Sequence, residues 1–486
     1  MPRLLPARLN RLLTCFDWGM VMDGFLDTVT LSRMQFALTA MFHLIWPVST
    51  IGLSIFLVFL EFRWLRTGQE EYYRHAKYWG RLFFLNVAIG VATGIPLEFQ
   101  FGTNWSVFAR AGGDFFGHIL GYEAAMAFML EASFMGIMMF GWKRVSPTVH
   151  LLATSMVAFG ASLSAFWIMV ANSWMQTPRG GFFDKGKFVV TSHLQAIFNP
   201  DMLWSVPHMW VAALEISVFV VGGLSAWYLY HNRHMGFFLS SFKWAAIAAI
   251  LITPLQIGLG DGSGRSAYLY DPPKLAAMEA HWYTNPPGQG APFSVLAWPD
   301  PEKQENLWSI EIPTLLSLLT THTTTGQIKG LREFPRKDQP PVAITYYAFR
   351  IMVVIGTALF ILMLWTLGVW RRGGLHIGSV SSQKWLLRAW MAALPLSFLA
   401  METGWVTREV GRQPWIIHGL LRTGESASLV PAGAVAASLL AFSLVYALLA
   451  LLFFFFARRI ITQGPELPQA GITITGGYGS IGGEGK

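Results

Sequence analysis

Long runs of apolar residues, separated by short polar connections, dominate the sequence between about residues 34 and 456. Several runs reach the roughly 20 residues that an α-helix needs to cross a lipid bilayer. The pattern therefore predicts an all-α integral membrane protein, a bundle of about nine transmembrane helices. We expect these helices near residues 34–60, 80–101, 117–141, 149–173, 208–230, 240–259, 343–369, 384–402 and 430–456.

Lysine and arginine gather in the connections after the first, third, fifth and seventh predicted helices and after the last one. In membrane proteins these residues are enriched on the cytoplasmic side. The distribution predicts a multi-pass protein of the bacterial cytoplasmic (inner) membrane, with its N-terminus outside and its C-terminus in the cytoplasm. It also explains the net charge of +8 without a nucleic-acid partner.

Three arginines before the first predicted helix conflict with this orientation, because they would lie outside: Arg3, Arg8 and Arg11. Translation from Met22 would remove them, and we favour that start. Residues 1–30 are interpreted as a leader that is too poor in continuous apolar residues for a convincing signal peptide.

The predicted helices divide the rest of the chain into four parts. Residues 31–259 hold helices one to six, and residues 343–457 hold helices seven to nine. Residues 260–342 form an outward-facing loop that opens with the glycine-rich stretch Gly260–Gly264, and connections of this length are usually functional. Residues 458–486 are predicted to be a disordered cytoplasmic tail, because their composition is glycine-rich and lacks an apolar period.

Composition narrows the candidate chemistry. Hydrophobic residues make up 53% of the 486 residues and charged residues only 13%, about half the charged share of soluble domains. The single cysteine, Cys15, excludes an internal disulfide and any site built from several cysteines. We find no Walker loop, dinucleotide-binding glycine motif or zinc signature, so nucleotide chemistry of the soluble type is not expected.

Polar groups at membrane depth are the first candidate site. Residues 401–415 directly follow an apolar run and contain Glu402, Arg408, Glu409 and Arg412. Ionisable groups are costly in a bilayer, so their clustering indicates a cofactor, an ion path or a set of buried ion pairs.

Two histidines lie inside or at the start of predicted helices, His43 and His208. A neutral imidazole that faces a helix bundle can bind a metal or a haem, but a hydrogen bond to a neighbouring helix explains it equally well. Met352 is by default an ordinary membrane methionine. It becomes a candidate ligand only if its thioether faces a haem.

Two pairs of charged residues allow more than one interpretation. Glu123 and Glu131 lie eight residues apart, about 12 Å along a helix, so they could form a proton relay or two separate hydrogen bonds between helices. In the outer loop, Lys274 and Glu279 could contact the ring oxygens of a quinol. Taken alone, a solvated helix face is the simpler interpretation of that pair.

Several long motifs occur in the order that is typical of one family. They are Ser32–Ala40 (SRMQFALTA), Gly94–Trp105 (GIPLEFQFGTNW), Ala171–Gln176 (ANSWMQ) and Gly411–Trp415 (GRQPW). With these motifs the sequence resembles subunit I of the cytochrome bd-type quinol oxidases from about Thr30 to Phe456. The resemblance implies a nine-helix, haem-bearing subunit.

The resemblance implies a ligand for each of three haems. His208 and Met352 would be the axial pair of a low-spin haem b, and Glu409 the axial ligand of a high-spin haem b. His43 would bind the third haem, which is a haem d or a third haem b.

The resemblance also implies roles for residues around these haems. Arg350 and Arg412 would lie near the haems, where a fixed cation balances propionates or tunes the potential. Trp405 would lie between haems, and Glu123 and Glu131 would belong to the proton region.

The implied reaction is electrogenic quinol oxidation coupled to reduction of dioxygen to water. Quinol would bind near Lys274 and Glu279 and release its protons outside, while protons for water would come from the cytoplasm. Subunit I of this family works with membrane subunit II and often with a small third subunit.

Two features depart from the better-known members of the family. The outer loop is short, as in the branch called cyanide-insensitive oxidases, whose haem d content varies. Ala132 and Ala161 stand where polar side chains are expected.

Two other functions would also fit a polytopic membrane protein. A di-haem reductase would commonly place two histidines on each of two helices, and a proton-coupled transporter would commonly show repeats and broken helices. We find neither pattern in the sequence.

Overall fold

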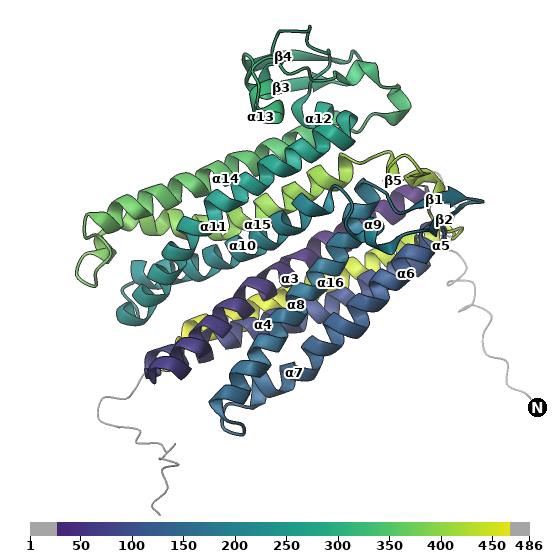
Figure 1. Cartoon of the computed structure of the whole chain (residues 1–486). Helices are drawn as coiled ribbons and strands as arrows, with labels where there is room; N and C mark the ends of the chain where they lie inside the picture. The colour runs from purple at the N-terminus through teal and green to yellow at the C-terminus, as the bar shows by residue number, and fades with distance from the viewer. Residues whose placement is uncertain (1–26, 467–486) are drawn as a thin grey trace, which may run out of the picture.

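The computed structural model describes residues 27–466, and long α-helices make up most of this part of the chain (Figure 1). The fold class predicted from the sequence is confirmed. Within the described residues, eight helical segments are long and apolar enough to cross a membrane: α3 (Thr28–Thr67), α4 (Glu70–Thr103), α6 to α7 (Gly113–Phe140), α8 (Pro147–Gln176), α10 (Met202–Tyr230), α11 (Met235–Tyr270), α14 (Val342–Arg371) and α16 (Ala432–Gln463).

The helix expected near residues 384–402 is present as α15 (Lys384–Val410). It packs against α10 and α14 inside the bundle. In contrast to these eight segments, α15 is not marked as a membrane span by its length and composition alone.

The third predicted helix is interrupted by a different helical geometry. It consists of α6 (Gly113–Tyr122), the π-helical turn η1 (Glu123–Phe128) and α7 (Met129–Phe140). Glu123 and Glu131 are therefore not separated by two regular α-helical turns. Short π-helical segments are often found at functional sites.

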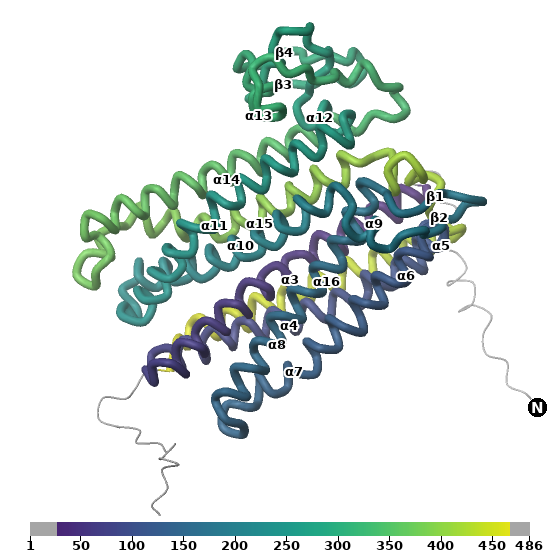
Figure 2. Tube along the Cα trace, viewed as in Figure 1, coloured from purple at the N-terminus to yellow at the C-terminus, as the bar shows by residue number. Residues whose placement is uncertain are grey.

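The long helices form two neighbouring groups (Figures 1 and 2). One group contains α10, α11, α14 and α15, and the other contains α3, α4, α6 to α7, α8 and α16. Helix α10 joins the groups, because it packs against α11 and α15 as well as against α3 and α8. The largest apolar core draws buried side chains from both groups, among them Leu57, Phe83, Phe219, Phe242 and Trp390.

A small layer covers the ends of α11 and α14 and corresponds to the predicted outer loop (Figure 1). It contains α12 (Pro272–Glu279), the strands β3 (Phe293–Asp300) and β4 (Glu305–Ile312), and α13 (Leu315–Thr321). The two strands form an antiparallel hairpin. Helix α12 packs against α11 and α14, and β3 packs against α14.

Shorter elements connect the long helices. They are α5 (Ser106–Ala111), β1 (Gly181–Asp184), β2 (Lys187–Val190), α9 (His193–Ile197), β5 (Trp415–Ile417), β6 (Leu421–Arg422) and the 3₁₀ turns η2 (Leu331–Glu333), η3 (Arg336–Asp338), η4 (Val380–Ser382) and η5 (Thr423–Glu425).

The ends of some predicted segments differ from the observed elements. Helix α11 continues to Tyr270, so the stretch Gly260–Gly264 is helical and the outer layer starts at Asp271. Helix α16 continues to Gln463, so the first residues of the predicted tail are helical. A helix satisfies its own backbone hydrogen bonds, which favours its extension through glycines beside a membrane. The rest of the predicted tail (467–486), and the predicted leader with Met22 (1–26), lie outside the described residues.

Candidate functional site

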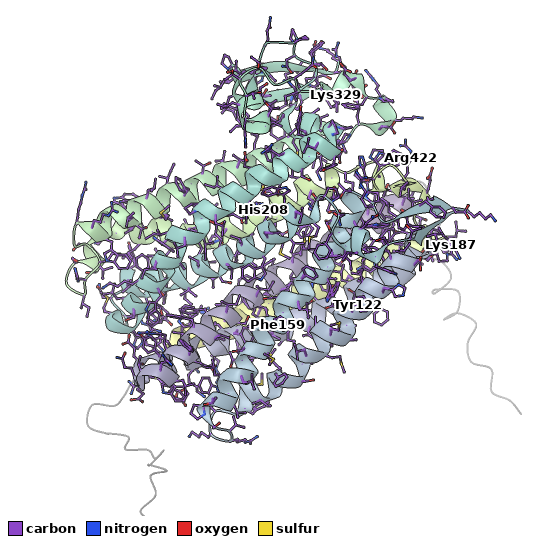
Figure 3. The ribbon with its side chains drawn as sticks, in the orientation of Figure 1. Tyr122, Phe159, Lys187, His208, Lys329 and Arg422 are labelled. Carbon is purple, nitrogen blue, oxygen red and sulfur yellow. The ribbon has the colours of Figure 1, made fainter. Side chains whose placement is uncertain are left out.

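His208 lies in the second turn of α10, near the middle of the molecule (Figure 3). Its Nδ1 atom is buried and makes no hydrogen bond of normal geometry within the described residues. A Cβ atom at Gly260 of α11 would stand 3.3 Å from Cε1 of this ring. The glycine therefore leaves space directly beside a buried imidazole.

Met352 has a similar environment on the neighbouring helix α14. A Cβ atom at Gly404 of α15 would stand 3.0 Å from its Sδ atom. The imidazole of His208 and the thioether of Met352 thus belong to one four-helix group, and each lies against a glycine of an adjacent helix. This arrangement suits a flat cofactor held between helices.

His43 on α3 has a hydrogen-bonding pattern that defines its tautomer. Its Nδ1 lies 3.0 Å from Oγ1 of Thr93 on α4, and that hydroxyl donates to the carbonyl of Ile89 at 2.9 Å. The hydroxyl oxygen must then accept the Nδ1 proton of His43, which leaves the Nε2 lone pair free to bind a metal. Gly94 adds space, because a Cβ there would lie 3.0 Å from the ring.

Glu409 is the centre of a partly buried polar cluster near the end of α15. Asn172 of α8 donates to one carboxylate oxygen at 2.8 Å, and Arg412 donates to the other. Arg412 is only 4% exposed. Arg408 donates to Asn172 at 2.6 Å and to Asp201 at 2.6 Å. The cluster holds one carboxylate against two fixed cations, as expected for an anionic ligand.

Lys274 and Glu279 of α12 are buried, with exposed fractions of 8% and 4%. The alternative of a solvated helix face is therefore wrong. Lys274 Nζ donates to the side chain of Gln176 at 2.9 Å and to the carbonyl of Arg408 at 3.0 Å. Burial is the main cause that lowers the pKa of Lys274 to about 8.

Glu279 faces a different partner from Lys274. Arg350 of α14 donates to its carboxylate at 2.5 Å and to the carbonyl of Ser294 in β3 at 2.9 Å. Burial raises the pKa of Glu279, although the guanidinium opposes this effect. The side chains of Lys274 and Glu279 therefore contact different groups and do not face each other across one binding site. Each is attached to a helix that carries a candidate haem ligand.

Three acidic side chains lie close together on α4 and on the α6 to α7 segment. Ser164 of α8 donates to Glu123 at 2.7 Å. Glu98 and Glu131 both lie within electrostatic reach of Glu123. The structure therefore adds Glu98 to the predicted acidic pair.

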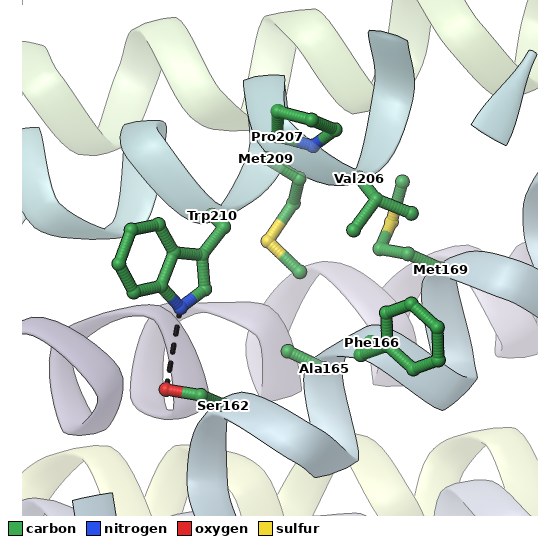
Figure 4. Close-up of a pocket in the computed structure, with 8 residues that line it drawn as sticks. All are labelled: Ser162, Ala165, Phe166, Met169, Val206, Pro207, Met209 and Trp210. Atoms are coloured by element: carbon green, nitrogen blue, oxygen red, sulfur yellow. Dashed lines mark hydrogen bonds between the residues drawn. The ribbon is translucent and has the colours of Figure 1, made fainter. Parts of the chain in front are cut away.

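An apolar cavity of about 320 Å³ lies between α8 and α10, and His208 is not among its lining residues. Figure 4 shows its lining, in which Trp210 donates to Ser162 at 3.2 Å. Trp405 packs in an adjoining apolar cluster that includes Val48, Ala213 and Met401. The cavity and the tryptophans thus lie on the side of α10 that faces α3 and α8.

Several members of the site were not predicted individually. Asp201, Asn172 and Gln176 position Arg408, Glu409 and Lys274. Asn172 and Gln176 lie in the ANSWMQ motif, which was noted without a role for either side chain. Asp201 lies in a short connection and gave no signal in the sequence.

Comparison with known proteins identifies the family to which a chain with this site belongs. The family model described as cytochrome bd terminal oxidase subunit I matches residues 31–465. The chain belongs to this family. The assignment confirms the resemblance found in the sequence, and it includes every residue that we place in the site.

Relatives of the family support the assignment over most of the chain. The cytochrome bd-II ubiquinol oxidase subunit 1 of Escherichia coli is 34% identical, covering 91% of this chain and 98% of the relative. The cytochrome bd ubiquinol oxidase subunit 1 of Bacillus subtilis is 37% identical, covering 91% and 95%. The bd oxidase structure from Geobacillus thermodenitrificans matches with a TM-score of 0.82 and 30% identity, covering 90% of this chain and 99% of that chain.

The bd oxidase family implies haem cofactors, and the described residues fit them. His208 has a buried, unpartnered nitrogen, His43 presents a free Nε2 lone pair, and Met352 presents its thioether beside a glycine. Glu409 supplies an anionic oxygen next to Arg412. Imidazole, thioether and carboxylate groups with space beside them are suitable donors for haem iron.

Proposed function

We propose that this chain carries the haems of a terminal quinol oxidase, oxidises quinol at its outer layer and reduces dioxygen to water inside the bundle. The family assignment makes it a quinol oxidase subunit. The observation that supports the internal assignment best is the pair His208 and Met352, each set against a glycine within one helix group.

The ligand assignment follows from the donor set. His208 and Met352 would hold a low-spin haem b, Glu409 a high-spin haem b, and His43 a haem d or a third haem b. Haems held by these residues would supply the redox chemistry that links quinol oxidation to dioxygen reduction. Arg412 holds Glu409 in its ionised form, and Thr93 keeps the proton of His43 on Nδ1. Trp405 would lie between haems.

Quinol would be oxidised at α12 and the residues that contact this helix. Lys274 and Glu279 are the candidates for contact with quinol, and Arg350 orders Glu279 and β3. A carboxylate with a raised pKa is a suitable acceptor for a quinol proton. Proton release from this layer would then occur on the outer side.

Quinol oxidation should depend on pH through Lys274. Its pKa of about 8 means that the side chain is an ammonium below this pH and a neutral amine above it. If the ammonium orients quinol, kcat/KM for quinol should fall by up to about tenfold per pH unit above that pKa. Lys274→Gln should lower kcat/KM at neutral pH and remove this alkaline limb. The exposed Lys329→Gln is the control, and an unchanged limb in Lys274→Gln would contradict the assignment.

The role of Met352 can be tested by adding one methyl group at the glycine that faces its sulfur. Gly404→Ala would place a Cβ 3.0 Å from Sδ, so we expect a displaced thioether and a shifted low-spin haem band. Gly356→Ala on α14, where nothing lies within 4 Å, is the matched control. The same spectrum in both variants would show that Met352 is not a ligand.

Charge separation would arise because protons are released and taken up on opposite sides. The positive connections predict an N-terminus outside and a cytoplasmic C-terminus. Protons for water would pass Glu131 and Glu123, supported by Ser164. As a bd oxidase subunit I, the chain works with subunit II in the bacterial inner membrane, and we propose a small third subunit as a further partner.

The reduced-minus-oxidised absorption spectrum of the complex, purified from native membranes, tests the proposal. Haem b bands with a far-red chlorin band would support three haems including haem d, and haem b bands alone would make the third haem a b-type variant. Haem bands without quinol-dependent oxygen consumption would favour a reductase with another acceptor. Folded protein without haem would favour a transporter and overturn the proposal.

A further inference from the structure

A second buried ionisable pair lies at the opposite end of the bundle from the outer layer. Glu61 is near the end of α3, and His150 and Thr154 are in the first two turns of α8. Their exposed fractions are 2%, 2% and 0%. The turn between α7 and α8, which closes over this pair, lies at the end of the molecule away from α12 (Figure 1).

Every polar atom of the pair has a partner. His150 Nδ1 lies 2.8 Å from Glu61 Oε2, and its Nε2 lies 3.1 Å from the carbonyl oxygen of Met138. Thr154 donates to the other oxygen of Glu61 at 2.9 Å. Trp142 covers the imidazole, with ring centroids 4.0 Å apart, and Lys77 lies over the indole at 5.2 Å.

This geometry requires a shared proton. A carbonyl oxygen can only accept, so Nε2 of His150 must carry a proton. The 2.8 Å contact between Nδ1 and Glu61 then needs a second proton, either on the ring or on the carboxyl group. Without it, two lone pairs would face each other in a water-poor environment, which is costly. The pair therefore retains one proton that can move along a single hydrogen bond.

Helix α8 connects the pair to the acidic residues at membrane depth. Gly160 packs against Glu131, since a Cβ at Gly160 would lie 3.1 Å from the Cβ of Glu131, and Ser164 donates to Glu123. From His150 to Ser164 these positions lie within an arc of about 120° on α8 and span about 21 Å of its length. One side of α8 thus contacts Glu61, Glu131 and Glu123 in succession along its length.

We propose that Glu61 and His150 form the proton-holding station through which protons from the cytoplasm reach Glu131 and Glu123. The inference rests on the proposed function and adds two residues to its uptake route. The mobile proton moves between Nδ1 of His150 and the carboxyl group of Glu61, while Nε2 keeps its own proton on the carbonyl of Met138. When Glu61 passes the mobile proton on, a proton from the cytoplasm replaces it on the pair, so the pair returns to its starting charge. Between Thr154 and Glu131, bridging water molecules carry the proton over about 9 Å of helix.

Glu61→Gln in the complete complex tests the station. The amide keeps the size of the side chain and can donate to Nδ1, but it cannot release a proton. We expect a normal haem spectrum, turnover at least tenfold lower, a larger solvent deuterium isotope effect, and haems that stay more reduced during turnover. Proton uptake, followed with a pH indicator after oxygen is added to the reduced complex, should slow by the same factor.

Matched variants separate proton transfer from a structural role. Ser155→Ala on the same helix removes a hydrogen bond to the carbonyl of Leu151 but no titratable group, and it should keep turnover within about twofold of wild type. If Glu61→Gln does not assemble, His150→Gln tests the same step, because its amide can still bond to its neighbours but cannot relay a proton. Normal turnover and isotope effect in either assembled variant, or failure of both to assemble, would overturn the inference. A wild-type complex without haem or oxidase activity would instead contradict the proposed function.

Discussion

Replacing Met352 with leucine should abolish the absorption signal of a six-coordinate low-spin haem and lower quinol oxidation at least tenfold. Leucine has a similar volume, and such exchanges usually cost less than about 1.5 kcal/mol, so the bundle should still fold. What the variant lacks is the sulfur lone pair that would bind the iron. The measurement is the reduced-minus-oxidised spectrum of the purified Met352→Leu complex, compared per mole of protein with wild type.

The same exchange at Met363 is a control on the same helix. Met363 is 4% exposed and packs in the main apolar core, so Met363→Leu tests the cost of losing a buried thioether alone. Its spectrum should match that of wild type. If Met352→Leu keeps the low-spin signal, Met352 is not an axial ligand, and the proposed pair with His208 is wrong.

Replacing Glu409 with glutamine should remove one haem from the complex and destabilise the C-terminal end of α15. The amide leaves the buried guanidinium of Arg412 without its anionic partner, whereas Arg408 keeps its ion pair with Asp201. Removal of one member of a buried ion pair costs about 3–5 kcal/mol, and we expect the lower end because the Glu409 side chain is 34% exposed. Haem content per protein and the thermal midpoint of unfolding measure the two effects.

Glu425 supplies the control for this experiment. It lies on the same side of the molecule, in the turn η5, and is exposed. Glu425→Gln should leave haem content and thermal midpoint unchanged. A Glu409→Gln complex that retains all its haem would assign Glu409 a purely electrostatic role toward Arg412.

The sequence predicted the helices well because apolar length is a local property. It predicted their ends poorly where glycines or charges occur, as at Gly260–Gly264 inside α11 and at residues 458–463 of α16. Those segments are helical because the helix supplies their backbone hydrogen bonds. The π-helical turn at Glu123 was also not predicted, since no residue type encodes it.

The partners of the site residues could not be predicted from the sequence, because they depend on which helices become neighbours. Lys274 and Glu279 were expected to act together, yet one contacts the main chain of α15 and the other contacts α14. The acceptor of Arg408, Asp201, comes from a connection with no distinctive motif. The sequence motifs indicated which residues belong to the site, but the packing of the helices determines which of them contact one another.

The two attachments of α12 have a consequence for the order in which the protein matures. Glu279 and its partner Arg350 are 71 residues apart in the chain, and Lys274 and the carbonyl of Arg408 are 134 residues apart. At about 5–20 residues per second, the ribosome completes that longer interval roughly 7 to 27 s after it passes Lys274. Until then Lys274 lacks its acceptor on α15, and the outer layer cannot close. The outer layer can therefore reach its final contacts only after α14 and α15 have been inserted. The docking of α12 is thus a late step of assembly.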